Sequence, residues 1–348
     1  MPWATFWLDQ IGIPKPSQVV MTHLFDLGYP STEYKSDRFG YRGTSLQDFY
    51  ARFPDDEACL RHVFAMRYGD GIECPKCERP GRWYRIRGTR RFQHPCGQDI
   101  WPLTGTVFER THIPLQIWFY AMLHFANSSS GVTTTFLGRQ LGVSHKAAYR
   151  LADRLRMHMA AIDRDKSVGR PGEPVEVRIE TLDGVHTAGH PLRGAAKAVI
   201  IGDSESVQTT LIGRPRRHVL RAIIKDKAAA GAVPVTSCKC TYRVLEEFGT
   251  RTPSVRLVDD FVDPCSLVSP AKSFLNHMRK PMSNTYRRVG YANLWKYLKE
   301  FEFRYNRRHC SHRIFRELTD HFPDLSAQSR EDLEAWSSRA QLQRSRDK

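Results

Sequence analysis

The most constraining feature of the chain is a stretch that alternates apolar and charged residues, residues 174–182. Val175, Val177 and Ile179 are each followed by a charged residue, namely Glu176, Arg178 and Glu180. A period of two is the pattern of a β-strand that is buried on one face. The stretch therefore predicts a strand at the edge of a hydrophobic core.

The patterns after this strand indicate a mixed sheet. Two more β-rich runs come next, then a helical pattern with apolar residues at helix spacing, then further strand and helix patterns. The expected strands are 195–202, 207–213, 232–236 and 254–258, and the expected helices are 217–230 and 242–248. Three strands followed by crossover helices predict an α/β fold. Sheets of this kind carry their chemistry at strand ends.

Composition and charge indicate which kind of partner the chain binds and in which compartment it works. The chain has 348 residues with a net charge of +16, from 53 basic and 37 acidic residues. Such an excess indicates a polyanionic partner, most simply double-stranded DNA, although a basic protein without such a partner is the alternative. No apolar run approaches the ~18 residues of a membrane span. The N-terminus lacks a signal-peptide pattern, so a cytoplasmic, nucleoid-associated location is expected. Eight cysteines are then interpreted as ligands or free thiols.

The cysteine spacing predicts a structural zinc site. Cys74 and Cys77 form a Cys-x-x-Cys knuckle, whose tight turn directs two thiolates at one ion. A zinc ribbon needs a second pair about fifteen to twenty residues further on. His94 and Cys96 occupy that place, so the expected ligand set is Cys74, Cys77, His94 and Cys96. The alternative is an eroded ribbon held together by apolar packing.

Between the two ligand pairs lies a strongly basic stretch. Residues 82–91 contain five arginines, with three aromatic residues among or beside them. Basic and aromatic side chains in one segment suit phosphate contact or base stacking, although a solvated hairpin face has the same pattern. The predicted DNA contacts here are Arg85, Arg87, Arg90 and Arg91.

Residues 133–159 predict two helices joined by a turn at 141–144. Gly142 suits the bend, and Ser144 suits the N-cap of the second helix. In a helix-turn-helix this second helix enters the major groove. The residues predicted to contact DNA are Ser144, His145, Lys146, Tyr149, Arg150 and Arg154. The alternative is an ordinary helical hairpin.

Several weaker patterns complete the chain. Polar caps at Ser45 and Asp55 predict two short helices, and Cys59 on the second is expected to be a packed thiol. Further helices are expected at 114–126 and 291–308, with a polar linker between residues 161 and 174. The last twenty residues are charged and are expected to be frayed. Residues 1–43 contain no motif that indicates a function.

The order of these segments resembles that of zinc-ribbon insertion-sequence transposases of the ISXO type. The similar segments are 70–77, 103–108, 141–144, 175–177 and 303–308, and the resemblance covers about residues 44–322. It implies this domain layout: an N-terminal extension (1–43), a helical lead-in (44–72), a zinc ribbon (73–110), a helix-turn-helix DNA-binding domain (111–162), a linker (163–174), an RNase H-like core with C-terminal helices (175–322) and a polar tail (323–348).

The resemblance implies a core that cuts and joins DNA with two divalent ions held by three acidic or amide residues. Mg²⁺ needs such oxygen ligands. The matching positions carry Arg178, Ser237 and Lys272 instead, with Ser269 at the amide position. A cation at ~4 Å from a divalent ion costs about 4 kcal/mol per unit charge at an effective dielectric near 20. No catalytic magnesium is therefore expected, unless other acids substitute: Glu176, Glu180, Asp183, Asp203, Asp259 or Asp260.

The ribbon also departs from the family pattern, which would place a cysteine at Gln93, and His94 is expected to compensate. The sequence thus favours a catalytically inactive, transposase-derived DNA-binding protein, a transcriptional regulator or nucleoid-associated factor that binds as a homodimer. One alternative is an active strand-transfer enzyme with relocated carboxylates. Another is an interaction module whose basic face binds an acidic protein.

Overall fold

The computed structural model of the protein describes residues 44–69, 72–182, 187–188, 196–213, 215–237, 239, 241–242, 256–257, 269–286 and 289–338. Residues 43–348 form one compact unit, distinct from residues 1–42. No described helix combines the length and apolarity needed to cross a membrane. The expected helix at 242–248 lies almost wholly outside the described residues.

Two short helices precede the ribbon, and both begin at the predicted caps. Helix α2 (Leu46–Arg52) starts after Ser45, whose side chain accepts a hydrogen bond from the amide of Asp48. Helix α3 (Asp56–Tyr68) starts after Asp55, whose carboxylate accepts from the amide of Ala58. Each cap satisfies an amide that has no partner within the helix. Cys59 is fully buried on α3, as expected of a packed thiol.

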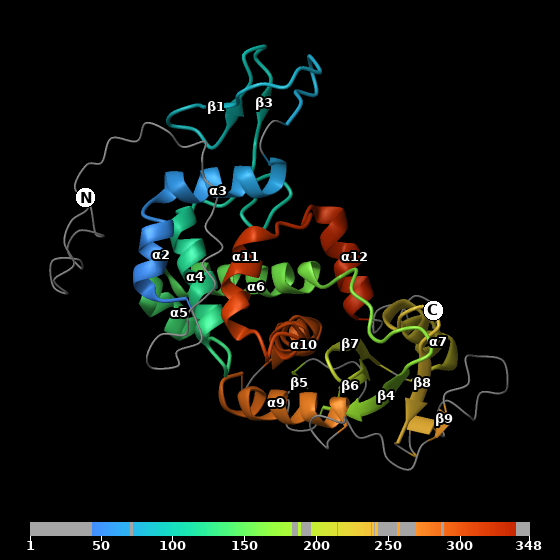
Figure 1. Ribbon diagram of the computed structural model, residues 1–348. Helices are drawn as coiled ribbons and strands as arrows, with labels where there is room; N and C mark the ends of the chain where they lie inside the picture. The colour runs from blue at the N-terminus through green and yellow to red at the C-terminus, as the bar shows by residue number, and fades with distance from the viewer. Residues whose placement is uncertain are drawn as a thin grey trace, which may run out of the picture. The chain divides into compact units, whose positions relative to one another are not determined.

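The ribbon is a three-stranded antiparallel sheet that packs on α3 (Figure 1). Its strands are β1 (Tyr84–Arg85), β2 (Phe92–Gln93) and β3 (Asp99–Ile100). The ring of Phe92 stacks on Phe64 of α3 with centroids 4.1 Å apart. This contact joins the ribbon to the helical layer beneath it.

Three helices follow, and the second and third are joined by the predicted turn. They are α4 (Leu115–Asn127), α5 (Thr134–Leu141) and α6 (His145–Ile162). Gly142 ends α5 in the left-handed region at φ +63°, which glycine adopts without strain. Ser144 caps α6 by accepting from the amide of Ala147 at 3.3 Å. Both local predictions are confirmed.

The predicted α/β region contains a five-stranded mixed sheet in the order β7-β6-β4-β8-β9. Strands β7, β6 and β4 are antiparallel neighbours, and β8 and β9 extend the sheet in parallel with β4. The strands are β4 (Pro174–Thr181), β6 (Lys197–Gly202), β7 (Val207–Ile212), β8 (Val233–Thr236) and β9 (Arg256–Leu257). A separate parallel pair joins β5 (Thr187–Ala188) to β10 (Val289–Gly290).

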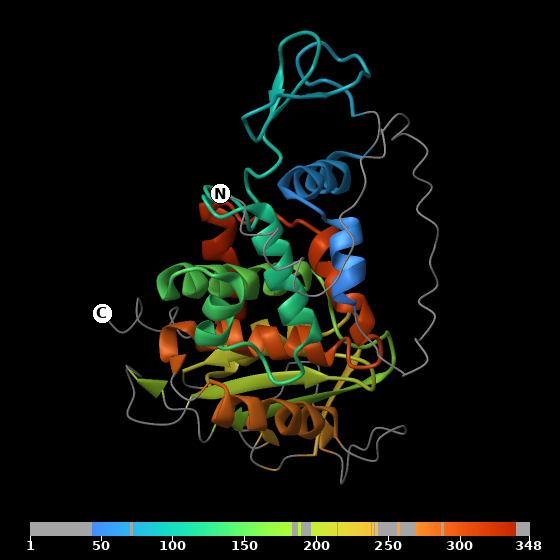
Figure 2. The same ribbon diagram turned by 90° about the vertical axis from the view of Figure 1, so that its left-hand side faces the viewer.

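Helices cover both faces of this sheet (Figure 1), and Figure 2 shows the helices at the C-terminal part of the chain against it. Helix α7 (Arg217–Lys227) packs its apolar residues against Val175 and Val177, the buried face that the period-two pattern predicted. On the other face lie α9 (Pro270–Asn284) and α10 (Tyr291–Tyr305), whose apolar residues share a core with Ala198 and Ile200 of β6. The sheet is therefore buried on both sides.

Side chains at the end of α10 close the outer edge of β7. The amide of Asn306 accepts from the backbone N–H of Val207 at 2.8 Å and donates to its carbonyl at 3.0 Å. Glu302 accepts from the backbone N–H of Thr209 at 2.7 Å. Further along, Leu211 forms a parallel bridge with Ser338. Residues 301–306, Phe-Glu-Phe-Arg-Tyr-Asn, thus serve to bind the edge of the sheet within the protein.

A buried ion network ties α10 to α6. Glu300 is fully buried and lies 2.8 Å from Arg156 of α6 and 3.0 Å from Arg304. Tyr286 donates to the same carboxylate at 3.0 Å. One carboxylate thus pairs with two buried guanidinium groups and connects the helical layer to the α/β region.

Two regions differ from the sequence-based expectation. Beyond the short 3-10 turn Ser311–Arg313 and α11 (Ile314–Asp320), the expected frayed end contains helix α12 (Ala327–Ser337). Leu333 on α12 is 1% exposed, and the Trp336 ring lies 2.8 Å from Nζ of Lys227. In the expected linker, Asp163 is buried in an ion pair with Arg307 at 2.8 Å. Both segments contain few apolar residues among many charged ones, so their sequence does not indicate that they are packed against the rest of the chain.

Candidate metal centre and nucleic-acid interface

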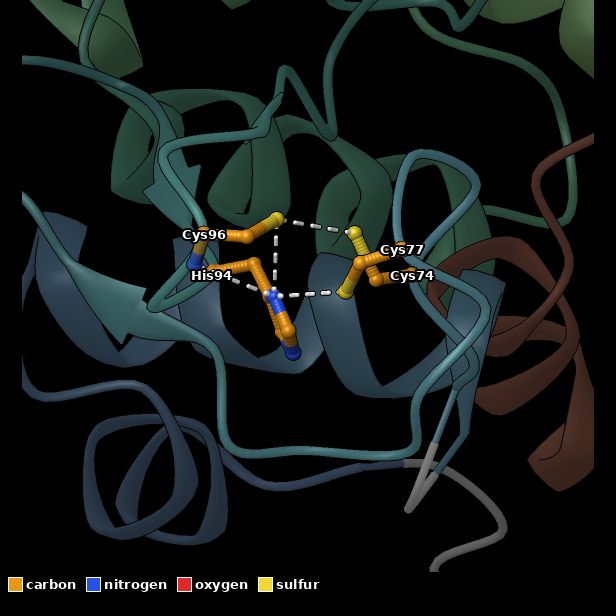
Figure 3. Close-up of side chains that lie close together, drawn as sticks. All are labelled: Cys74, Cys77, His94 and Cys96. Carbon is orange, nitrogen blue, oxygen red and sulfur yellow. Dashed lines mark hydrogen bonds between the residues drawn. The ribbon is translucent and has the colours of Figure 1, made fainter.

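The four predicted zinc ligands lie together at one end of the ribbon (Figure 3). The Sγ atoms of Cys74 and Cys96 are 3.4 Å apart, and Nδ1 of His94 lies 3.6 Å from Sγ of Cys77 and 3.1 Å from Sγ of Cys96. All four donor atoms fall within 4.8 Å of one another. Tetrahedral zinc with bonds of about 2.0–2.3 Å requires donor atoms at about this separation.

Two tight turns bring these donors together. In the knuckle, the N–H of Glu78 donates to the carbonyl of Cys74 at 2.8 Å. At the second pair, the N–H of Gly97 donates to the carbonyl of His94 at 2.8 Å, and Gly97 adopts φ +86°. Gly81 leaves room for the imidazole, since a Cβ there would lie 2.5 Å from Nε2 of His94.

The donor set fits a structural zinc ion. Three thiolates and one imidazole complete a tetrahedron and leave no open position for a substrate, as in structural rather than catalytic sites. Cys74 is fully buried and His94 is 6% exposed, so solvent has little access. The neighbouring Gln93 is not a ligand, because its amide donates to Asp99 at 3.0 Å. His94 is thus the residue that completes the site.

The structure places the four ribbon arginines in different environments. Arg85 donates to Glu57 of α3 at 3.1 Å, and Arg90 donates to the carbonyl of Thr111 at 2.9 Å. Arg91 forms an ion pair with Asp99. Arg87 is exposed. The four therefore do not form one common surface, and three have partners within the protein.

The residues predicted on α6 divide into an exposed group and one internal residue. Ser144, His145, Lys146, Tyr149 and Arg150 are all exposed at the start of the helix. Arg154 is half-buried and donates to the carbonyls of Glu109 at 2.6 Å and Val107 at 3.3 Å. Burial lowers the pKa of Arg154, with the nearby charge of Arg330 acting in the same direction. Arg154 thus holds the 107–109 segment against α6.

Two of the three positions that the resemblance assigns to metal ligands, Arg178 and Lys272, lie close enough to the carboxyl group of Glu176 to affect its charge. Arg178 on β4 is paired with Glu180, Ser237 directly follows β8, and Lys272 is exposed in the first turn of α9. Glu176 is fully buried and accepts from Oγ of Ser269 at 2.7 Å and from the N–H of Ala271 at 3.0 Å.

The environment of Glu176 raises its pKa above the usual value. Burial raises its pKa, and this effect outweighs the hydrogen bonds from Ala271 and Ser269 and the attraction of Arg178 and Lys272, which all act to lower it. The carboxylate therefore caps the start of α9. Because both oxygens of Glu176 already accept hydrogen bonds from Ser269 and one also accepts from Ala271, they are poorly placed to hold a divalent cation.

The other acids that were weighed as substitutes do not gather around Glu176 in the described part of the chain. Glu180 is held by Arg178, and Asp203 accepts from the backbone N–H groups of Gly169, Glu205 and Ser206. Asp183, Asp259 and Asp260 lie outside the described residues. Within the described residues, the Cys₃His cluster is the one group of three or more candidate ligands close enough to share an ion.

Trp101 is a surface feature that sequence reasoning missed. It is 51% exposed, directly after β3, and the guanidinium of Arg91 lies 6.0 Å from its ring centroid. In an extended chain Trp101 lies on the same face as Asp99, two residues before it, and Arg91 is the ion-pair partner of Asp99. This spacing is the signal in the sequence that could have identified Trp101.

Comparison with known proteins connects the ribbon to mobile DNA elements. Residues 54–98 match the family model of the transposase zinc-ribbon domain of the IS1595 type. Over 106 residues, the chain is 27% identical to an uncharacterized protein in transposable element ISH50 of Halobacterium salinarum, a match that covers 29% of this chain and 35% of that protein. No solved structure matches the chain. The segment that carries the Cys₃His cluster is thus similar to the zinc ribbon of transposases.

Proposed function

We propose that the protein is a transposase-derived, catalytically inactive protein that binds double-stranded DNA, as a transcriptional regulator or nucleoid-associated factor. One observation carries the proposal most strongly: α6 exposes donors at its start while its later turns are buried in the core. Arg156 and His158, from those later turns, are 3% and 0% exposed. A helix held in this way presents its N-terminal turns to a partner, as recognition helices do.

The exposed start of α6 suits the major groove of DNA. Lys146 and Arg150 are one helical turn apart and project from the same face. Ser144, His145 and Tyr149 add hydrogen-bonding groups around them, and α5 and the Gly142 turn provide the helix-turn-helix arrangement. The net charge of +16 supports attraction to the phosphate backbone. A homodimer would present two such helices to inverted half-sites.

Charge reversal at Lys146 and Arg150 tests the proposal. The double variant Lys146→Glu with Arg150→Glu should lose specific DNA binding and weaken nonspecific binding at least about tenfold, because two phosphate or base contacts become repulsive. Binding of the wild type should also weaken steeply with salt. Duplex fragments that bind the protein are first recovered from genomic DNA. Fluorescence anisotropy with these fragments then measures both the effect of the variant and the effect of salt.

A matched control comes from α7. Arg221 and Lys225 are exposed and have the same i, i+4 spacing on a helix that covers the sheet. Their reversal changes the net charge by the same amount but should reduce affinity far less. Equal losses in the two double variants would mean that only the overall charge matters, and unchanged binding after reversal on α6 would contradict the assignment of the recognition helix.

The inactive, RNase H-like interpretation of the core is supported by two features. Three antiparallel strands are followed by two strands parallel to the central one, β4. At the positions that the resemblance assigns to the metal ligands stand Arg178, Ser237 and Lys272, and the buried carboxyl group of Glu176 near Arg178 and Lys272 already accepts from the N–H of Ala271. We infer a core that serves as a scaffold or dimerisation platform.

The pH dependence of Glu176→Gln checks this interpretation. Because the folded-state pKa of Glu176 is raised above its usual value of 4.5, its contribution to stability is complete below that value and is lost as pH rises through the raised pKa. The glutamine variant should therefore be more stable relative to wild type at about pH 7.5 than at about pH 4.5, as measured by urea denaturation. Millimolar Mg²⁺ should stabilise neither protein.

An active enzyme would give the opposite results. If Glu176 were a metal ligand, Mg²⁺ or Mn²⁺ would raise the stability of the wild type but not of Glu176→Gln. Nicking of supercoiled DNA that depends on these ions and on Glu176 would establish the alternative of a strand-transfer enzyme with relocated carboxylates.

A further inference from the structure

The small sheet of the ribbon has two faces of different character. Its register pairs Tyr84 with Gln93 and Gln93 with Asp99, so these three side chains share one face. Arg85, Phe92 and Ile100 pair in the same way on the opposite face. The two faces can therefore be assigned separate roles.

The inner face is occupied by α3. Phe92 is 5% exposed and stacks on Phe64, and Arg85 is paired with Glu57. These contacts fix the sheet on the helix and leave the face of Tyr84 outermost.

The outer face exposes two aromatic rings with a polar strip between them. Tyr84 and Trp101 are 56% and 51% exposed, the two most exposed large hydrophobic side chains of the described residues. Gln93, Asp99 and Arg91 form the strip, joined by a 3.0 Å hydrogen bond from Gln93 to Asp99 and by the Arg91–Asp99 ion pair. Exposed aromatic residues on a rigid support are typical of a binding surface.

We propose that this outer face binds unpaired nucleotides, with one base stacked on Tyr84 and another on Trp101. This deepens the proposed function and rests on it, since it assigns the ribbon to single-stranded or frayed DNA and leaves the duplex to α6. Tyr84 lies on β1 and Trp101 directly follows β3, so the two positions are separated by two strand spacings and two residues along the strand, roughly 12 Å between Cα atoms. Nucleotides separated by this distance can stack independently, because every base offers a π-face.

The charge around the rings complements a nucleic-acid strand. Residues 73–101 contain seven basic and three acidic side chains. Arg82 and Arg87, on either side of Tyr84 in sequence, are both exposed. A positively charged groove or ridge beside stacking rings is the usual composition of a single-strand site. Within a duplex the bases stack on one another, so their faces are closed to such rings.

A protein partner fits this face less well. The centre of a protein interface is depleted of charged residues, whereas here an ion pair separates the two rings. The sheet has only two residues in each strand, far smaller than a standard interface. Stacking of a base requires only one ring at a time.

The test uses the full chain and two variants, Tyr84→Ala and Trp101→Ala. Each should weaken binding of a fluorescent oligothymidine by about 5- to 100-fold, the usual effect of removing one stacking ring. Binding of a mixed-sequence duplex, and of an abasic oligonucleotide of the same length, should change by less than about twofold, since neither presents a free base face. Retained zinc content shows that the ribbon remains folded.

Two controls separate stacking from other effects. The conservative variant Trp101→Phe keeps a ring and should recover most of the affinity. Tyr50→Ala, which removes a 38% exposed aromatic side chain from α2, should leave oligothymidine binding unchanged. Equal losses for oligothymidine and the abasic strand would overturn the proposal, as would unchanged binding in both alanine variants.

The outcome is distinguishable from failure of the proposed function. Reversal at Lys146 and Arg150 should remove duplex binding and leave oligothymidine binding largely intact. A wild type that binds duplex but not oligothymidine overturns this inference alone, whereas a wild type without duplex affinity overturns the proposed function. If Trp101→Ala abolishes self-association in sedimentation without altering oligothymidine binding, the face is a protein interface and the inference is wrong.

Discussion

Replacing Cys74 and Cys77 with serine should release the zinc ion and unfold residues 73–101. Structural zinc in small domains contributes an apparent ~10–16 kcal/mol of binding free energy, which is also folding free energy for the segment that it closes. The ribbon strands have only two residues each and cannot supply a comparable core. Elemental analysis should find about one zinc per wild-type chain and almost none in the double variant.

Cys310→Ser is the matched control. Cys310 is a half-buried free cysteine outside the cluster, so its replacement should retain the zinc and the resistance of the ribbon to proteolysis. In the double variant, cleavage should appear within residues 73–101, while α3 and α6 keep their protection. Less than about half an equivalent of zinc in the wild type would contradict the assignment of a structural zinc site.

Glu300→Ala should destabilise the protein by about 3–5 kcal/mol. Burial alone would raise the pKa of Glu300, but the charges and hydrogen bonds of Arg156 and Arg304 hold it below its usual range. Removing the carboxylate leaves two guanidinium groups that are 3% and 5% exposed without their counter-charge. The penalty of two uncompensated buried charges dominates the result.

The comparison for this variant is Glu173→Ala, since Glu173 pairs with Arg170 at the surface. Their side chains are 56% and 68% exposed with the charged atoms 4.0 Å apart, so the expected loss is below about 1 kcal/mol. Guanidinium chloride denaturation of both variants gives the two free energies. Similar values would show that the buried network is not the link between α6 and the α/β region.

Local signals in the sequence predicted much of the fold. The strand at β4 followed from strict alternation, and α2, α3 and α6 began at the residues with capping side chains. Helix α12 is not evident from the sequence, because it has few apolar residues among many charged ones and its Trp336 packs against Lys227 and Lys299 from distant segments. Periodicity within one segment cannot reveal a partner supplied by another.

The zinc site could be predicted because its ligands follow a recognisable spacing along the sequence. Cys74, Cys77, His94 and Cys96 followed from the ligand pattern, and the structure brings them together. The arginines were harder, because a guanidinium group donates equally well to a phosphate or to a carbonyl of its own chain. Arg90 and Arg154 bind backbone carbonyls in this structure, a result that depends on tertiary contacts with segments 111–113 and 107–109.

The side chains from α10 along β7 also limit how copies of the chain can assemble. The side chains of Asn306 and Glu302 bind backbone groups of Val207 and Thr209, and the backbone of Ser338, directly after α12, bridges to Leu211. Two molecules therefore cannot join their sheets into one continuous ribbon through this strand. A dimer that spans inverted DNA repeats would have to use another surface of the chain, and mutations at Asn306 or Glu302 would expose backbone groups of β7 that could pair with a second copy.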